Sequence, residues 1–275
     1  MRKEVHPIGV FDSGYGGLTI LEHFRKRLPA YDYIYVGDNA RTPYGTRSFE
    51  TVYQFTRQAV MYLFNEGCPL VVLACNTASA KALRTIQQID LPASYPLNRV
   101  LGVIRPTIEV IGAISHTRHI GLLGTIGTIV SKSYNMEIAK LYPEMKVTGE
   151  ACPMWVPLVE NGEHTGDGAD FFIKNNLANL FASDPQIDTV VLGCTHYPLL
   201  EEKIRKYLPV GVSLVSQGPF VADSLNDYLL RHSEMANRLS KNETCRFMTT
   251  EEEKKFTETA SLFLNQPIHV EKIVI

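Results

Sequence analysis

The chain has 275 residues, with 27 basic and 29 acidic side chains and a formal net charge of -2 at neutral pH. This balance, without long runs of like charge, argues against nucleic acid or an anionic membrane surface as a partner. Five scattered cysteines in a chain of this size indicate reduced thiols, and the lack of a signal-peptide or membrane-spanning apolar stretch predicts a cytoplasmic protein.

The chain opens with a strand and a glycine-rich loop. Residues 7–11 are predicted as the strand, and residues 12–17 (DSGYGG) as the loop that starts a helix over 18–27. The glycine spacing fits neither the dinucleotide fingerprint nor the Walker pattern, so a tight turn and close helix packing are the favoured explanation. Asp12 and Ser13 still stand at the end of a strand, where polar groups can face a ligand.

The next elements lead to a cysteine at a strand end. The pattern predicts, in order, a strand at 33–37, a turn-rich loop at 38–45, a helix at 48–66, a strand at 69–74, a helix at 77–88 and a strand at 99–103. Cys75 therefore lies in the turn between a buried strand and a helix start. In open α/β sheets ligands bind at this edge, where helix N-termini offer free N–H groups and positive potential.

The opening pattern then recurs. Residues 120–125 (IGLLGT) align with 8–13 (IGVFDS), and Cys194 follows its strand at nearly the same interval as Cys75. A duplicated α/β unit explains this recurrence. The remaining predicted elements are a helix at 131–142, a strand at 146–150, an irregular stretch at 151–162 with two prolines, a helix at 167–181, a strand at 189–193, a helix at 198–207, a strand at 212–216, a helix at 219–231, a strand at 246–249, a helix at 251–264 and a strand at 268–275.

This succession predicts an α/β protein. At 275 residues, one large domain or two medium domains are open, and two are preferred. We expect two similar α/β domains with mostly parallel sheets, related by a pseudo-twofold axis, and an active site between them.

Two cysteines in matching niches suggest a chemistry that neither suggests alone. A lone cysteine at a strand end is usually structural, because free cysteine is among the most buried residue types. Cys75 and Cys194 are each followed by polar residues, which suit a wet, charged ligand. A zinc site is disfavoured because the Cys194-x-His196 spacing is unusual and no CxxC accompanies it, and the lack of CxxC also disfavours disulfide exchange.

Facing thiols suit racemisation, in which one side removes an α-proton and the other side returns one. The reaction needs a thiolate opposite a thiol, and a reference thiol pKa of ~8.5 lets both forms be reached near neutral pH when the surroundings lower it. Backbone N–H groups at the two helix starts and nearby hydroxyls would stabilise the charge that develops in the transition state.

Four motifs in this order resemble those of the glutamate racemase family and span most of the chain: FDSGYGGL at 11–18, PYG at 43–45, ACNTAS at 74–79 and GCTHYP at 193–198. The resemblance implies an isomerase without cofactor or metal that interconverts L- and D-glutamate, a small-molecule substrate, for cell-wall peptidoglycan. It also implies that the chain returns after about residue 208 to its first domain, which would comprise 1–98 and 209–275 around a second domain at 99–208.

The resemblance carries functional residues with it, position by position. The implied acid/base residues are Cys75 and Cys194, with Asp12 assisting near Cys75 and both His196 and Glu150 assisting near Cys194. The implied substrate-binding residues are Asp12, Ser13, Tyr44, Gly45, Asn76, Thr77, Thr195 and His196. For Glu150, a solvated carboxylate at a strand end remains an equal alternative on its residue type alone.

Two positions depart from the family pattern. Tyr15 replaces a small aliphatic residue and Arg105 replaces an acidic one, which leaves open the interdomain contacts, allosteric activation and whether the chain forms a homodimer. An aspartate or other amino-acid racemase of the same superfamily is the nearest alternative, because fold and thiols would be shared. An amino-acid-binding sensor without activity is an alternative from another class.

Overall fold

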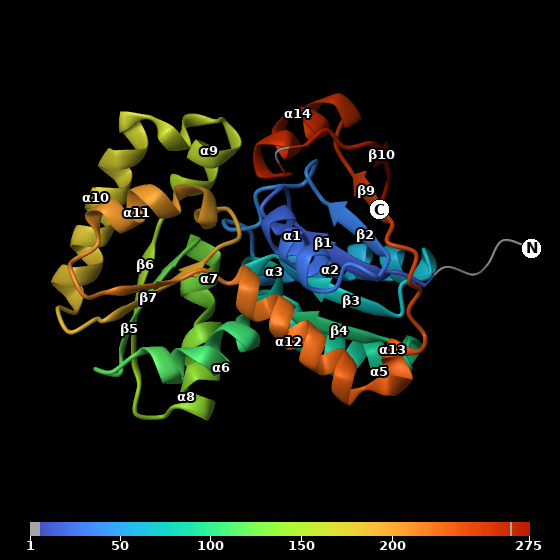
Figure 1. Cartoon of the computed structure of the whole chain (residues 1–275), viewed down its shortest axis with the longest axis horizontal. Coiled ribbons are helices and arrows are strands. Elements are labelled where there is room, and N and C mark those ends of the chain that lie inside the picture. Colours follow the sequence, from blue (N-terminus) through green and yellow to red (C-terminus); the bar gives the residue numbers. More distant parts are fainter. Residues whose placement is uncertain (1–5, 265) are drawn as a thin grey trace, which may run out of the picture.

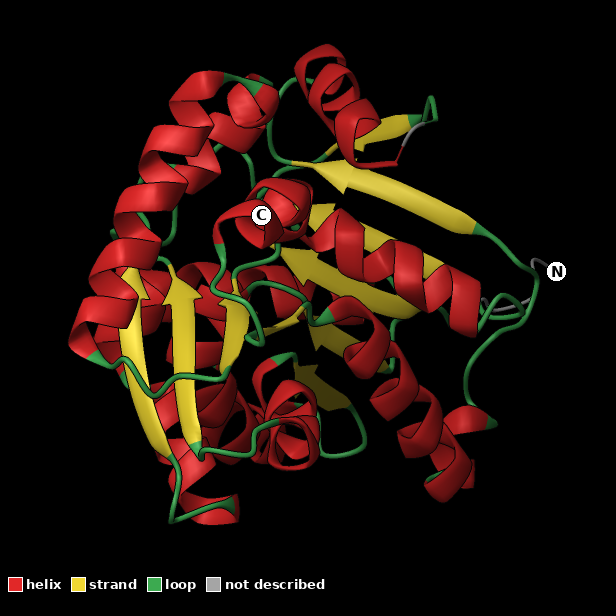
Figure 2. Ribbon diagram, turned by 60° about the vertical axis from the view of Figure 1, so that its left-hand side comes forward, coloured by secondary structure: helices red, strands yellow, loops and turns green. Residues whose placement is uncertain are grey.

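The computed structural model describes residues 6–264 and 266–275, which form two β-sheets flanked by helices (Figure 1, Figure 2). The first sheet has the order β10-β9-β2-β1-β3-β4, with β1 (Ile8–Asp12), β2 (Tyr33–Gly37), β3 (Leu70–Leu73), β4 (Arg99–Gly102), β9 (Cys245–Thr249) and β10 (Val270–Lys272). The second has the order β6-β5-β7-β8, with β5 (His119–Gly124), β6 (Lys146–Ala151), β7 (Thr189–Gly193) and β8 (Ser213–Val215). Every described strand pair is parallel, so the predicted α/β class is confirmed.

The helices connect the strands and cover the faces of the sheets (Figure 2). The longer ones are α1 (Gly17–Arg27), α2 (Phe49–Asn65), α6 (Ile104–Ile114), α8 (Ser133–Leu141), α10 (Asp167–Ser183), α12 (Gly218–Arg231) and α14 (Glu253–Leu264). The shorter ones are α3 (Asn76–Lys81), α4 (Leu83–Thr85), η1 (Ile86–Asp90), α5 (Leu91–Ser94), α7 (Ile126–Ser131), α9 (Trp155–Glu160), η2 (Glu163–Thr165), η3 (Tyr197–Leu200), α11 (Glu201–Tyr207) and α13 (Ser233–Ala236). Because helices lie on both faces, β1, β2, β3 and β7 are buried along their whole length and consist mostly of apolar residues.

The two sheets repeat one strand order. In the first sheet the strands β2-β1-β3-β4 are neighbours, and β6-β5-β7-β8 have the same arrangement in the second. The predicted recurrence therefore places β5 where β1 stands and β7 where β3 stands. As a result, Cys75 follows β3 and Cys194 follows β7 at equivalent points of the two sheets.

The chain crosses between the sheets twice, later in each case than predicted. Strand β4 belongs to the first sheet, and α6 then leads to β5 of the second. Strand β8 belongs to the second sheet, and α12 packs on α1 of the first. Residues 99–102 pair in the first sheet and 213–215 in the second, so both crossings lie a few residues beyond the limits 99 and 208 expected for the second domain. A short edge strand alone does not reveal which sheet it joins.

One short helix replaces an expected irregular stretch. The prolines at 153 and 157 suggested loop over 151–162, but α9 forms there, with Pro157 in its first turn. Proline is tolerated in the first turn because the N–H groups there have no intrahelical partner. Trp155 is fully buried and anchors this helix beside Tyr197, with ring centroids 4.8 Å apart.

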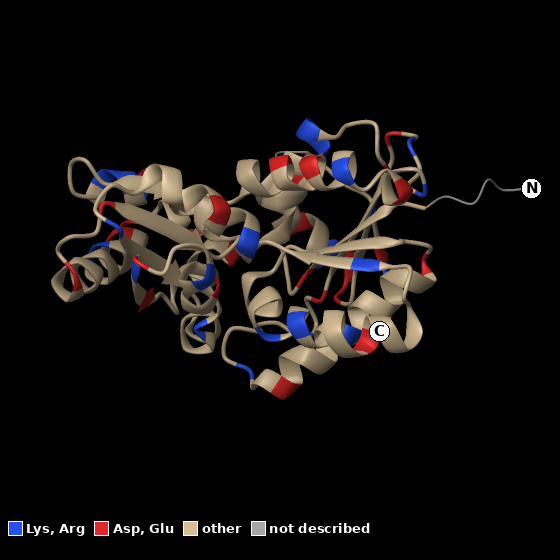
Figure 3. Cartoon of the chain, turned by 90° about the horizontal axis from the view of Figure 1, so that it is seen from below, with Lys and Arg blue, Asp and Glu red and all other residues tan. Residues whose placement is uncertain are grey.

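The charged residues are mixed in sign over the molecule. Figure 3 shows lysine and arginine interspersed with aspartate and glutamate on both halves. Within residues 6–264 and 266–275, no helix combines the length and apolar character needed to cross a membrane. In the same part of the chain, His, Cys, Asp and Glu side chains form no group of three or more that could hold a metal ion.

Candidate active site

One cavity collects residues from the carboxyl ends of both sheets. Its volume is about 270 Å³, and it is lined by Cys75 and Cys194 together. All of the predicted substrate-binding residues line it as well: Asp12, Ser13, Tyr44, Gly45, Asn76, Thr77, Thr195 and His196. Sites for drug-sized ligands occupy roughly 300–1,000 Å³, so this cavity suits a small molecule.

Cys75 occupies the N-cap position of α3, where β3 ends. Its sulfur lies 3.3 Å from the Ser13 hydroxyl and accepts a hydrogen bond from the Ala78 N–H at 3.5 Å. Burial raises the pKa of this thiol to about 12, and the nearby Asp12 carboxylate adds to the rise. Without a ligand, Cys75 is therefore protonated at neutral pH.

Asp12 ends β1 and faces the same cavity. Its Oδ2 accepts a hydrogen bond from the Gly14 N–H at 2.9 Å, which fixes the carboxyl group against the loop. Its Oδ1 is buried and has no hydrogen-bond partner within the described residues. Burial raises the pKa of this carboxyl group, while the charge of His196 opposes the rise. The unpaired oxygen can accept a hydrogen bond from a cationic group of a ligand.

Cys194 has an imidazole beside it in place of a carboxylate. Its sulfur lies 3.8 Å from Nδ1 of His196, and Nε2 of the same ring lies 2.9 Å from Oε1 of Glu160. Burial lowers the pKa of His196, but the hydrogen bonds with Cys194 and Glu160 outweigh it and raise the pKa to about 10. At neutral pH the ring is therefore an imidazolium, whose N–H faces the sulfur and can donate a hydrogen bond to it.

Glu160 takes the place that the resemblance gave to Glu150. The structure places Glu150 on β6, where its Oε1 accepts hydrogen bonds from Asn176 at 2.8 Å and Asn179 at 3.2 Å on α10. Glu150 does not line the cavity, whereas Glu160 at the end of α9 does. The expectation that Glu150 lies near His196 is corrected accordingly. Glu160 was missed because the two prolines predicted an irregular stretch where α9 forms.

A glycine in the first loop allows the two halves to meet closely. A Cβ atom on Gly16 would come within 2.4 Å of both Nδ1 of His196 and Oγ1 of Thr195. The hydroxyl of Thr19 also donates a hydrogen bond to the Thr195 carbonyl at 3.0 Å. The glycine-rich loop therefore serves close packing between the halves, in agreement with the packing explanation of its sequence.

Hydroxyl groups of both halves meet above the first helix turn of α3. Oγ1 of Thr77 lies 3.0 Å from Oγ1 of Thr125 and 3.4 Å from Oγ1 of Thr128. Thr125 lines the cavity and caps α7, and it is not among the residues predicted from the sequence. The internal repeat contained the signal, since Thr125 aligns with Ser13.

A third thiol also lines the cavity. Cys152 is fully buried, and its Sγ donates a weak hydrogen bond to the Glu150 carbonyl at 3.7 Å. Burial raises the pKa of this thiol well above its usual range, and the charge of Glu150 adds to the rise. It lacks the neighbours that distinguish Cys75 and Cys194.

Comparison with known proteins identifies the class. Residues 18–225 match the family model described as Asp/Glu/Hydantoin racemase. This match covers more than half of the chain, which therefore belongs to that family, whose members are isomerases.

Within the family, full-length relatives are glutamate racemases. The glutamate racemase of Shouchella clausii is 40% identical over 268 residues, which cover 97% of this chain and 92% of the relative. A glutamate racemase isoform of Bacillus anthracis superposes with a TM-score of 0.89 at 35% identity, covering 99% of this chain and 98% of that one. The glutamate racemase of Francisella tularensis in complex with D-glutamate gives a TM-score of 0.86 at 33% identity, with 98% of each chain covered. The chain thus groups with the glutamate racemases.

Proposed function

We propose that the chain is a glutamate racemase that moves a proton at the α-carbon between Cys75 and Cys194. The observation that carries the proposal is that equivalent strand ends of two like sheets direct both thiols to one small cavity. Solved relatives hold D-glutamate in one case and L-glutamate in another, which supports glutamate as the substrate.

The proton balance of the reaction is simple. A thiolate on one face of the substrate takes the α-proton and becomes a thiol, which leaves a planar carbanion. The thiol on the opposite face gives its proton to that carbon and becomes a thiolate. The two sulfurs have then exchanged protonation states, and the enzyme is ready for the opposite enantiomer. No redox step occurs and no cofactor is needed.

The surroundings support this exchange. Protonated Cys75 can act as the donor, and the imidazolium of His196 can donate a hydrogen bond to Cys194 when that sulfur acts as the base. The unpaired Oδ1 of Asp12 can receive the substrate ammonium group. N–H groups at the two helix starts, together with hydroxyl groups such as those of Ser13 and Thr195, can stabilise the substrate carboxylate as it gains charge.

Both thiols come from the same chain, so a homodimer is not required for the chemistry. The product D-glutamate would serve peptidoglycan synthesis, as the family membership implies. The proposed enzyme acts on the small molecule glutamate without a cofactor or a metal.

The proposal is tested in heavy water. The protein is incubated with L-glutamate without added cofactor, and loss of optical activity is followed together with deuterium entry at the α-carbon. We expect both to proceed, with D-glutamate as product. If neither change occurs with glutamate, the chain binds an amino acid without turning it over. If exchange occurs with aspartate alone, the chain is an aspartate racemase of the same superfamily.

A further inference from the structure

A buried polar network lies beside the cavity, where the two connections between the sheets meet. Gln217 follows β8 on the return connection and is 2% exposed. Its Nε2 donates a hydrogen bond to Oγ1 of Thr107 at 2.8 Å and a longer one to the carbonyl of Val103 at 3.4 Å. Val103 and Thr107 belong to the first connection, which enters α6. One side chain thus ties together both segments that join the halves.

The same side chain reaches the helix start beside a reactive thiol. Oε1 of Gln217 accepts a hydrogen bond from Nδ2 of Asn76 at 2.5 Å. The Tyr134 hydroxyl on α8 donates to Oδ1 of Asn76 at 2.7 Å and accepts from Nε2 of Gln217 at 2.8 Å. Asn76 directly follows Cys75 and lines the cavity. These three side chains form a closed ring of hydrogen bonds.

The ring members satisfy one another's polar groups within the protein interior. Asn76 and Tyr134 are 3% and 1% exposed, and Thr107 is fully buried. Every side-chain nitrogen and oxygen of the three ring members has a partner within the network, and none of them is among the buried polar atoms left without one in the described residues. A buried amide that loses its partner costs about 1–3 kcal/mol, so the ring holds each member in one orientation.

We propose that Gln217 is a positioning residue for racemisation: it fixes the Asn76 side chain and ties both connections together, so that the two thiols keep their spacing across the substrate. Gln217 does not line the cavity, and it acts through Asn76 and through the connections. The inference rests on the racemase function proposed above. A static network suits this task because reacting atoms must be held closely, and a misplacement of about 1 Å can cost ~100-fold in rate.

The test compares variants of the ring with a buried control. Q217L keeps the volume and removes the amide, and Y134F removes one hydroxyl from the ring. S115A is the control, since Ser115 is also buried and hydrogen-bonded, to Asp188 at 2.7 Å, but lies at the far, amino edge of the second sheet. Unfolding temperatures, kcat and KM are measured for each variant in both directions, after wild-type racemisation has been established.

For Q217L we expect kcat/KM to fall roughly 10- to 100-fold, chiefly through kcat. The fall must be equal in both directions, because the two enantiomers have the same free energy. Y134F should lower kcat/KM by a smaller factor. In the double variant Q217L/Y134F the fall should be smaller than the product of the two single factors, because both substitutions break the same ring. S115A should lose thermal stability and keep kcat/KM within about twofold. The proposal would be overturned if Q217L and Y134F kept the wild-type kcat/KM, or if their kcat/KM fell no more than that of S115A.

A titratable variant separates positioning from bulk stability. In Q217E the neutral carboxyl group can donate one of the two hydrogen bonds of the amide and can accept another, whereas the charged form cannot donate. The activity of Q217E relative to wild type should therefore rise as the pH falls through the pKa of the introduced group, while the ratio for Q217L stays flat. A flat ratio for Q217E would contradict the role. If Q217L does not fold, Q217E and Y134F decide the question, and an inactive wild-type enzyme would instead refute the racemase function.

Discussion

The two cysteine niches share a backbone plan and differ in the charge beside the sulfur. Cys75 has the Asp12 carboxylate and the Ser13 hydroxyl as neighbours, whereas Cys194 has His196, which is held by Glu160. Burial and a negative neighbour keep the first sulfur protonated, whereas a protonated imidazole lies beside the second. The duplicated fold supplies matching positions, and divergent neighbours place unlike charges beside the two sulfurs of the proposed two-base reaction.

The largest effect is expected when either niche loses its sulfur. Cys75→Ser and Cys194→Ser should each lower the rate of racemisation by ~100- to 10,000-fold, because a hydroxyl is too weak an acid to exchange the proton. Cys68→Ser and Cys245→Ser are matched controls outside the cavity and should stay near wild type. The rate of change in optical rotation measures all four. Full activity in either of the first two variants would remove that sulfur from the mechanism.

At the second niche, the sequence pointed to Glu150 as the carboxylate beside His196, whereas the structure has Glu160 there. Glu160→Gln should lower kcat roughly 10- to 100-fold, the scale of a lost charge-assisted hydrogen bond. Glu160 also raises the pKa of His196, so in this variant the alkaline loss of activity should move below the wild-type limb near pH 10. A kcat–pH profile measures both effects.

Glu150→Gln is the control for this prediction, since it changes the same functional group outside the cavity. It should keep kcat and the pH profile near wild type. If Glu150→Gln lost activity and Glu160→Gln did not, the assignment from sequence would be restored.

The outcome for these glutamates shows what the sequence could and could not predict. Strand-cysteine-helix units are local patterns, so Cys75, Cys194 and the polar residues after them were found from the chain alone, as were most strands and helices. Glu160 depends on a short helix that is stabilised by the burial of Trp155, a tertiary effect that outweighs the local proline signal.

Long-range placement was likewise beyond the sequence. Gln217 follows an edge strand and has no motif, and its partners are 83 to 141 residues away along the chain. The membership of β4 and β8 in their sheets depends on the course of the two connections. The repeat did contain the placement of Thr125, because the residue equivalent to Ser13 in the second half reaches the same cavity.

At the first niche, the effect of Asp12 on Cys75 can be measured by alkylation. Only the thiolate reacts, so labelling of Cys75 by iodoacetamide should increase with pH up to about 12. Asp12→Asn removes the charge that adds to the raised pKa, so its labelling profile should shift to lower pH. At a fixed pH below 12 we expect the variant to label several-fold faster. Peptide mass spectrometry follows Cys75 separately from Cys194 and Cys152.

An unchanged profile in Asp12→Asn would mean that burial alone sets the state of Cys75. The comparison of the two niches would then lose its electrostatic basis on the first side. Cys68 serves as an internal reference, because burial raises its pKa without help from Asp12 and its labelling should not respond to the substitution.

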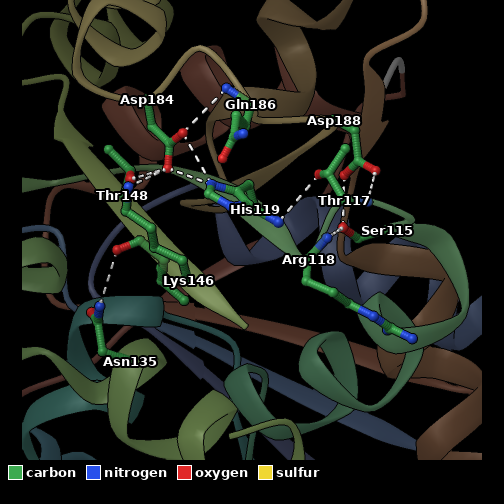
Figure 4. A network of polar contacts seen from close by, with 11 residues as sticks. Ser115, Thr117, Arg118, His119, Asn135, Lys146, Thr148, Asp184, Gln186 and Asp188 are labelled. Atoms are coloured by element: carbon green, nitrogen blue, oxygen red, sulfur yellow. Dashed lines mark hydrogen bonds and ion pairs between the residues drawn. The ribbon is translucent and has the colours of Figure 1, made fainter. Parts of the chain in front are cut away.

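The smallest effect is expected at the amino edges of the sheets, where both halves bury carboxylates. Asp184 bonds His119 at 2.9 Å and Lys146 at 3.0 Å (Figure 4), while Asp32 accepts hydrogen bonds from Asn242 and Thr244 in the first half. Burial disfavours the charged form of Asp184, but the bonds with His119 and Lys146 outweigh it and lower the pKa of Asp184 to about 2. A lowered pKa stabilises the fold above the unfolded value near 4, and this contribution is lost as the pH falls towards 2.

Asp184→Asn should therefore lower the free energy of unfolding by about 1–3 kcal/mol at neutral pH and by less near pH 2, where the wild-type carboxylate is itself being protonated. Denaturant unfolding at both pH values measures the difference, with kcat expected to stay near wild type because the network is remote from the cavity. Asp32→Asn makes the corresponding change in the first half. If both variants unfold in one transition, the two halves form a single cooperative unit joined through their connections, whereas an early transition in only one variant would show that the halves unfold separately.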